Sequence, residues 1–173
     1  MKKTILFLVL IVCGFWARGQ DGMVLRHVKG QKLIGVGSSY HFRGYSIDLG
    51  VDYVLAPEIF ASGKIKYERA MFDFTRSNKF MLDVGINHLV YKINENMYLN
   101  GHVGLVAGID YLAAKQTPQK ATEWHYGPNM GISFEYWIGR ICINPLILQN
   151  TMFGNYNGRG YVSMEINVKY PIF

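Results

Sequence analysis

The chain has 173 residues, of which 50% are hydrophobic and 17% are charged, and its formal net charge is +6 at pH 7. This mild basic balance comes without a run of Lys and Arg, so direct binding to nucleic acid is not expected. The two cysteines are Cys13 and Cys142, and loss of an export signal that holds Cys13 excludes an internal disulfide and a thiolate metal cluster.

Residues 1–19 have the three-part pattern of a cleaved export signal. Two lysines follow Met1, an apolar run covers residues 5–12, and small residues lie at Ala17 and Gly19, where a signal peptidase reads the chain. The apolar run is shorter than the roughly 20 residues that a membrane-spanning helix needs. We therefore expect cleavage, with a mature chain that begins near Gln20.

Cleavage divides the chain into three predicted parts. After the signal there is no apolar run long enough for a membrane helix and no Pro/Ser-rich linker, so neither a helical membrane protein nor a second domain is expected. The predicted parts are a signal peptide at residues 1–19, a short periplasmic N-terminal segment at residues 20–30 and one β-barrel domain at residues 31–173.

Eight segments of the mature chain alternate apolar and polar residues with the period of two that is typical of β-strands. The last is the clearest, with Val162, Met164, Ile166 and Val168 on one face. The seventh is the weakest, because Pro145 interrupts it. The predicted strands cover residues 31–42, 45–55, 59–72, 79–92, 97–112, 123–138, 140–152 and 161–173.

Charged residues test this phase, because apolar residues alone set it. Only Arg69 and Lys92 fall on the apolar face, both toward strand ends. An Arg or Lys on a lipid-facing strand costs roughly 2–4 kcal/mol at the bilayer midplane and little near the interfaces. The apolar face therefore suits lipid, and the opposite face suits a polar plug inside a lumen. The predicted plug residues are Asp48, Asp52, Lys64, Lys66, Glu68, Asp83, Asp110, Glu135, Glu165 and Lys169.

Aromatic residues and link lengths agree with a membrane barrel. Seven aromatic residues near strand ends on the apolar face are placed as interfacial girdles: Tyr45, Tyr53, Tyr67, Tyr111, Trp124, Tyr136 and Tyr170. Short links at residues 56–58, 94–96 and 139 alternate with longer ones at 73–78, 113–122 and 153–160, as periplasmic turns alternate with outer loops. The predicted outer-loop contacts are Lys115, Lys120, Asn155, Tyr156 and Arg159.

Together these patterns predict an all-β fold: a single eight-stranded antiparallel up-and-down transmembrane β-barrel in the outer membrane of a Gram-negative bacterium. The interior of such a barrel is just wide enough for side chains to fill. We therefore expect an ion-paired plug and no passage for large solutes. The expected partners are outer-membrane lipid and the barrel-assembly machinery, which the aromatic C-terminal residue Phe173 could address.

Signals for catalysis are poor. The chain has no Walker-type loop, no HExxH and no GxSxG motif, so no catalytic residue, metal ligand or cofactor is predicted. His102 and His125 share the polar face with Asp110, Ser133 and Glu135, which permits a His/Ser/acid arrangement. We favour the interpretation that both histidines are hydrogen-bonded members of the plug.

Three parts of the chain resemble a known family: Ile65-Lys66-Tyr67-Glu68-Arg69, the Gly/Ala-rich residues 101–111, and the region from Tyr126-Gly127 to the closing strand, which includes Phe153-Gly154-Asn155-Tyr156. In these parts the chain is similar to the small TraO proteins of conjugative transposons, an outer-membrane β-barrel-type family encoded in conjugal-transfer operons. The resemblance implies an accessory envelope role in DNA transfer between cells, beside other conjugal-transfer proteins. It implies no catalytic residues.

Three alternatives share much of this pattern. A generic small barrel could serve envelope integrity or adhesion through loops at residues 113–122 and 153–160. A lipid-modifying barrel enzyme would need the lining around His102 and His125 to open toward the bilayer. A soluble lipocalin-like barrel would invert the faces and place the apolar row around a ligand.

Overall fold

The computed structural model describes residues 27–72, 75–114, 120–154 and 160–172. The predicted signal peptide, and the predicted segment at 20–30 up to residue 26, lie outside these residues. The eight strands are β1 Lys32–His41, β2 Gly44–Ala56, β3 Ile59–Phe72, β4 Thr75–Asn94, β5 Met97–Ala114, β6 Lys120–Ile138, β7 Ile141–Thr151 and β8 Gly160–Ile172.

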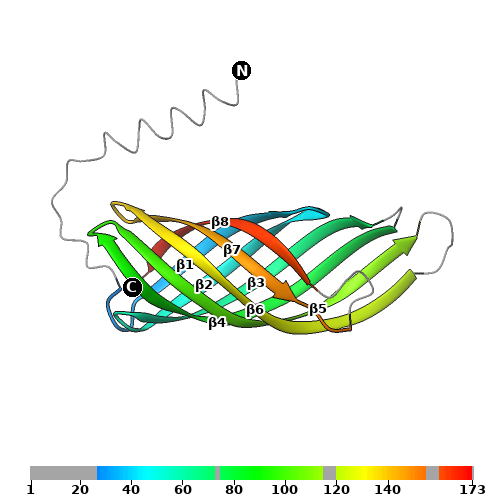
Figure 1. The fold of residues 1–173 in the computed structure, drawn as a ribbon, viewed down its shortest axis with the longest axis horizontal. Coiled ribbons are helices and arrows are strands. Elements are labelled where there is room, and N and C mark those ends of the chain that lie inside the picture. Colours follow the sequence, from blue (N-terminus) through cyan, green and yellow to red (C-terminus); the bar gives the residue numbers. More distant parts are fainter. Residues whose placement is uncertain (1–26, 73–74, 115–119, 155–159, 173) are drawn as a thin grey trace, which may run out of the picture.

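The strands form a closed antiparallel barrel in chain order, and β8 pairs with β1 to complete it (Figure 1). The closing register places Lys32 opposite Ile172 and Tyr40 opposite Met164. Closure gives every strand two hydrogen-bonded neighbours, although β6 pairs with β7 only from Asn129 onward, apart from a bridge between Tyr126 and Phe153. We call the end where β1 begins and β8 ends the terminal end, and the opposite end the loop end. The predicted fold class is confirmed.

Two predicted links are several residues longer than the observed ones. The link at residues 73–78 is wrong, because β3 ends at Phe72 and β4 already begins at Thr75. The link at 113–122 is also too long, since β5 continues to Ala114 and β6 starts at Lys120. In both places the strands continue to pair although their residues do not alternate between apolar and polar. Pairing with a neighbouring strand outweighs the weak intrinsic preference of these residues for a strand. The prediction that Lys120 lies in a loop is therefore wrong as well.

The strands are of unequal length. β4, β5 and β6 have 20, 18 and 19 residues, whereas β7, β8, β1 and β2 have 11, 13, 10 and 13. Figure 1 shows the long strands extending beyond the short ones at the loop end. One side of the barrel wall is therefore higher than the other.

The phase of β4 changes near the terminal end. The register between β4 and β5 shifts between Leu89 and Tyr91, so Lys92 lies opposite Tyr98, whose side chain is buried in the lumen. One extra residue in a strand moves the residues beyond it to the other face. The prediction that Lys92 breaks the charge rule is therefore wrong, whereas Arg69, opposite the exposed Tyr45, does face outward. The prediction also missed Lys32, which faces outward at the start of β1, opposite the exposed Tyr53 and Ile172.

Pro145 lies within β7 and does not end the strand. β7 pairs with β8 through Pro145 opposite Ile166, while its paired register with β6 skips from Leu146 to Ile143. Proline has no N–H to donate. The side chain of Asn144 instead donates to the carbonyl of Phe134 on β6 at 3.1 Å, so a polar side chain supports the barrel wall where the proline interrupts it.

Candidate functional site

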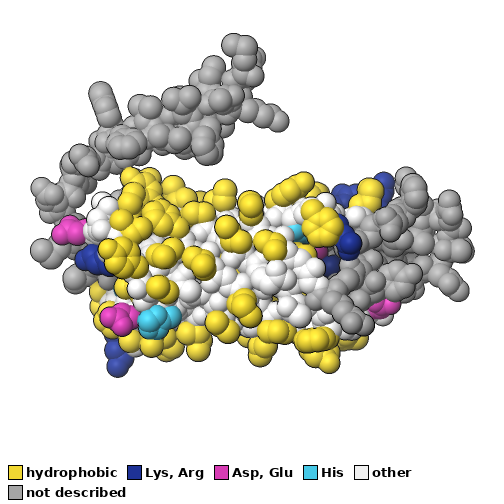
Figure 2. Space-filling view, in the orientation of Figure 1, with side chains coloured by type: hydrophobic (Ala, Val, Ile, Leu, Met, Phe, Trp, Pro, Cys, Tyr) yellow, Lys and Arg dark blue, Asp and Glu magenta, His cyan; other side chains and the backbone are white. Residues whose placement is uncertain are grey.

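The outer surface of the barrel is apolar around its whole circumference. Figure 2 shows charged side chains at the two ends of the visible face, and hydrophobic and uncharged ones between them. The predicted girdle residues Tyr45, Tyr53, Tyr111, Trp124 and Tyr170 are exposed. Exposed large hydrophobic residues come from every strand; examples are Ile34, Leu49, Ile65, Leu82, Leu105, Ile132, Ile147 and Ile166. An exposed apolar surface of this extent marks contact with lipid or with another protein.

The lumen is packed with polar and charged side chains. All ten predicted plug residues point away from the outer surface, and their exposed fractions lie between 0% and 8%. They are Asp48, Asp52, Lys64, Lys66, Glu68, Asp83, Asp110, Glu135, Glu165 and Lys169. Buried charges persist only when they are paired and hydrogen-bonded, so the contacts among these residues hold the interior together.

The centre of the lumen is an ion cluster around Glu165 of β8. Lys64 of β3 donates to Glu165 Oε2 at 3.1 Å, and Lys66 of the same strand donates to Glu165 Oε1. Residues two apart on a strand share a face, which is why both lysines reach one carboxylate. Nearby, Asn129 donates to Asp83 at 2.9 Å, and its own oxygen faces His102.

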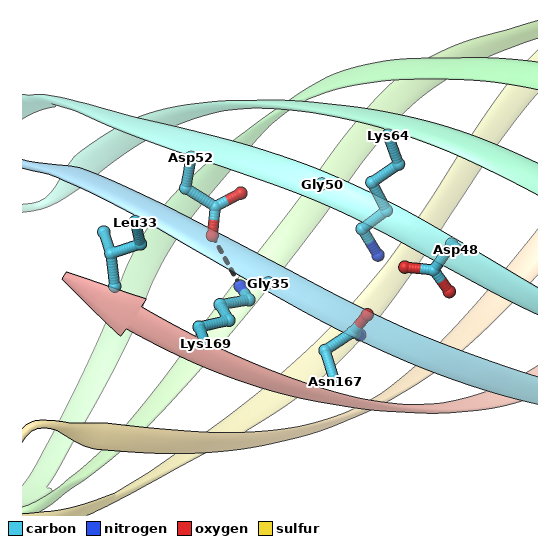
Figure 3. Close-up of a pocket in the computed structure, with 8 residues that line it drawn as sticks. All are labelled: Leu33, Gly35, Asp48, Gly50, Asp52, Lys64, Asn167 and Lys169. Carbon is cyan, nitrogen blue, oxygen red and sulfur yellow. Dashed lines mark ion pairs between the residues drawn. The ribbon is translucent and has the colours of Figure 1, made fainter. Parts of the chain in front are cut away.

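A second ion pair lies closer to the terminal end. Lys169 Nζ of β8 is 2.6 Å from Asp52 Oδ2 of β2, and the two side chains meet over Gly35 of β1 (Figure 3). The adjacent cavity of about 10 Å³, also lined by Lys64, has room for about one water molecule. The lumen at this level is therefore filled by side chains and does not form a pore.

The loop end holds a cluster of which only Glu68 was predicted. Glu68 Oε1 is 3.2 Å from Lys79 Nζ and 3.5 Å from His41 Nε2, and Tyr161 donates to Glu68 Oε2 at 2.9 Å. Lys79 and His41 were not among the predicted plug residues. Residues an even number of positions apart on a strand share a face. Lys79 is four positions before Asp83, so the same alternation predicts that it faces the lumen.

At the terminal end, aromatic side chains close the lumen. His27 lies with its ring centroid 4.8 Å from that of Tyr98 and 5.4 Å from that of Phe60, and its Nε2 is 2.9 Å from Glu135 Oε2. Trp137 Nε1 also donates to Glu135, at 3.1 Å. The residues just before β1 thus seal the barrel, although no sequence pattern predicts this role of His27.

In the part of the chain that the structure describes, no hydrogen bond joins either histidine of the conceivable His/Ser/acid arrangement to Asp110, Ser133 or Glu135. His102 of β5 lies opposite Gly131 of β6 and forms hydrogen bonds with Asn87 and Asn129. His125 is itself on β6, six residues before Gly131. Six residues of strand span about 20 Å. Asp110 accepts from Ser77, and Glu135 is engaged by His27 and Trp137. Among the described residues, neither ring nitrogen of His125 has a hydrogen-bond partner.

The remaining predicted site residues lie at the loop end. Lys115, Asn155, Tyr156 and Arg159 are outside the described residues, and the backbone of Lys120 is paired with Ala113 in the sheet. Within the described ranges, no His, Cys, Asp and Glu group of three or more is arranged to hold a metal ion. In that same part of the chain, no helix is long and apolar enough to cross a membrane.

Comparison with solved structures places this fold among outer-membrane barrels. A major outer membrane protein from Thermus thermophilus has a TM-score of 0.63 at 8% identity, over 82% of this chain and 98% of that one. The N-terminal β-barrel domain of Pseudomonas aeruginosa OprF has a TM-score of 0.59 at 10% identity, over 82% and 98%. Ail, the attachment invasion locus protein of Yersinia pestis, has a TM-score of 0.57 at 13% identity, over 84% and 100%.

No protein-family model matches the chain, and no curated protein matches it. The structural similarity, at identities of 8% to 13%, concerns the fold. A closed eight-stranded antiparallel barrel with an apolar outer wall and an ion-paired interior defines the class: a small β-barrel of the outer-membrane type.

Proposed function

We propose that this chain is a small outer-membrane barrel that serves conjugative DNA transfer as an accessory envelope component. The membrane location is supported by the apolar wall, since such a wall would be unstable in water. The conjugal role is supported by the resemblance to the TraO proteins in residues 65–69, in residues 101–111 and from residue 126 to the closing strand. A cleaved signal peptide at residues 1–19 belongs to the same proposal.

The observation that carries the proposal is the contrast between the two faces of the sheet. Leu49 and Ile65, which are opposite each other, are exposed, while their neighbours Asp48 and Lys66 are buried in the lumen. A filled interior provides neither a path for large solutes nor an open active site, so the proposed role is one of contact and assembly and not of transport or catalysis. The partners would be lipid, the barrel-assembly machinery and other conjugal-transfer proteins.

Two experiments test the proposal in order. Fractionation of the producing cell, followed by a gel of heated and unheated outer-membrane fraction, should give a band in that fraction whose mobility changes on heating. A soluble periplasmic protein without such a change would contradict the membrane location and favour a lipocalin-like barrel.

The conjugal role is then tested with a deletion strain. We expect the transfer frequency to fall and to recover with the wild-type chain, but not with an unrelated eight-stranded barrel expressed to the same level. An unchanged transfer frequency would contradict the conjugal role and leave the membrane location intact.

Attachment to another cell is the second candidate function. The protein Ail, whose name describes attachment, matches this fold over 100% of its own length, and the long strands β4, β5 and β6 form a raised wall at the loop end. A deletion strain with normal transfer frequency but reduced adherence to host or donor cells would favour this second function over the first.

A further inference from the structure

Three arginines lie together on the outer side of the barrel at its loop end. Arg43 is in the turn between β1 and β2, Arg69 is on β3 and Arg76 is on β4, and all three side chains are exposed. The plug does not use them, because they belong to the face opposite the lumen.

The strand register brings these arginines close to one another. The N–H of Met71 donates to the carbonyl of Arg43 at 2.9 Å, and Arg76 is opposite Met71 on the other side of β3. Arg69 is two residues before Met71, so both other arginines are its diagonal neighbours. Diagonal positions on one face of a sheet are roughly 7–8 Å apart, and the three arginines therefore form one patch.

The patch adjoins the apolar wall directly. Arg69 lies opposite Tyr45 of β2 on one side and opposite Asn78 of β4 on the other. Phe80 follows two residues after Asn78 on β4 and so faces the same way. Tyr45 and Phe80 are exposed, at 53% and 54%. The guanidinium carbon of Arg43 lies 4.6 Å from the centroid of the Phe42 ring. Cations bordered by exposed aromatic residues match the level at which lipid head groups meet acyl chains.

Two acids of the described part of the chain lie near the patch, and both face the lumen. Glu68 and Asp110 at this end are buried in the lumen. In the ranges that the structure describes, neither Arg69 nor Arg76 forms an ion pair with another residue. The rim at the terminal end is different, because it mixes cations and acids. Its exposed charged residues, among those that the structure describes, are Lys29, Lys32, Glu58, Lys92, Glu95 and Arg140.

We propose that Arg43, Arg69 and Arg76 bind the phosphate groups of lipid A, the phosphorylated glycolipid of the outer leaflet. Guanidinium groups pair with phosphate through two parallel hydrogen bonds, and three of them within one patch match a ligand with more than one phosphate. The apolar residues below the patch contact the acyl chains of the same lipid. This proposal rests on the proposed outer-membrane location, with the loop end outside.

The test is a calorimetric titration of the mature, refolded chain in a non-ionic detergent with bis-phosphorylated lipid A and with its dephosphorylated form. We expect the dephosphorylated lipid to bind at least about tenfold more weakly. The double variant R69Q/R76Q should lose at least about tenfold in affinity for the phosphorylated lipid, and R69K/R76K should lose less, because it keeps the charge without the paired hydrogen bonds.

The matched control is K32Q/K92Q, which removes two cations from the terminal end and should change the affinity less than about twofold. Equal binding of both lipids, an unchanged R69Q/R76Q or an equal loss in the control would overturn the lipid A site. So would full competition by inorganic phosphate at millimolar concentration, since it would indicate a site for free anions. Each variant is first shown to be folded by its heat-dependent mobility. Absence of a folded, lipid-inserted wild type would instead contradict the proposed location.

Discussion

Lys169 and Asp52 form an ion pair at 2.6 Å although their strands, β8 and β2, do not pair with each other. Gly35 of β1 lies between them, opposite Lys169 on one side and Gly50 on the other. A Cβ atom at Gly35 would be 3.0 Å from Lys169 Cγ. The absence of a side chain at this position therefore lets the lysine cross the intervening strand.

This pair predicts strong coupling between its members. Either K169M or D52N alone leaves a buried group without its partner, which should lower the free energy of unfolding by about 3 kcal/mol. The double variant K169M/D52N should come within about 1 kcal/mol of wild type, because no unpaired charge remains. Urea unfolding in detergent measures the free energy of unfolding of the four refolded proteins: wild type, the two single variants and the double variant. Additive losses in the double variant would contradict the ion pair.

The central cluster predicts that the closed lumen can be opened. Wild type should show no porin-sized current steps in a planar bilayer, because its interior is filled. Replacing the three long side chains in K64S/K66S/E165S removes the middle of the plug but keeps Asp48 and Asp83. We expect ion currents well above the wild-type leak, with preference for cations. The variant K32Q/K92Q, altered only at the rim, is the control and should behave as wild type. Currents of porin size in wild type would contradict a filled lumen.

The outer wall predicts a cost for charge that depends on depth. Leu49 is 62% exposed and lies in the middle of β2, opposite Val36 and Ile65. Leu49→Arg should cost about 2–4 kcal/mol of unfolding free energy in phosphatidylcholine vesicles, whereas Tyr53→Arg, opposite Lys32 near the terminal end, should cost about 0–1 kcal/mol. Urea titration in vesicles gives both values. If Leu49→Arg were as stable as Tyr53→Arg, the wall would not face lipid.

Alternation along single strands predicted most of the fold. On β2, the period of two alone predicts that Asp48 and Asp52 face the lumen, and both are buried there. The same reasoning was wrong at Lys92, because the register shift near Leu89 and Tyr91 is an extra residue that no local pattern reveals. Predicted strands are also too short where the paired residues are polar: β4 begins at Thr75 and not at the predicted Lys79.

The contacts inside the lumen could not be predicted in the same way. Lys64 and Lys66 meet Glu165 across the barrel interior, and that choice of partner depends on strand tilt and on the register of strands that do not touch. His27 precedes the first strand, where no alternation exists to place it. The arginine patch was equally hidden, since Arg43, Arg69 and Arg76 come together only through the pairing of three successive segments.

Gly127 of β6 lies so close to the end of β7 that the barrel wall has no room for a methyl group at this position. A Cβ atom at this position would overlap the carbonyl oxygen of Thr151. The adjacent Tyr126 exchanges two backbone hydrogen bonds with Phe153, at 3.2 and 2.8 Å, which hold the end of β7 against β6. Gly127→Ala should force these segments apart and lower the free energy of unfolding by about 1–3 kcal/mol.

The matched control for this glycine is Gly63 on β3, because a Cβ atom there would meet nothing within 4 Å. Gly63→Ala should be neutral or stabilise the barrel by about 0.4–1 kcal/mol, since alanine restricts the unfolded chain more than glycine does. Urea unfolding in the same detergent gives both differences. A Gly127→Ala protein as stable as Gly63→Ala would mean that the wall near Thr151 yields easily. In that case the close approach of β7 to β6 would not hold the loop end of the barrel together.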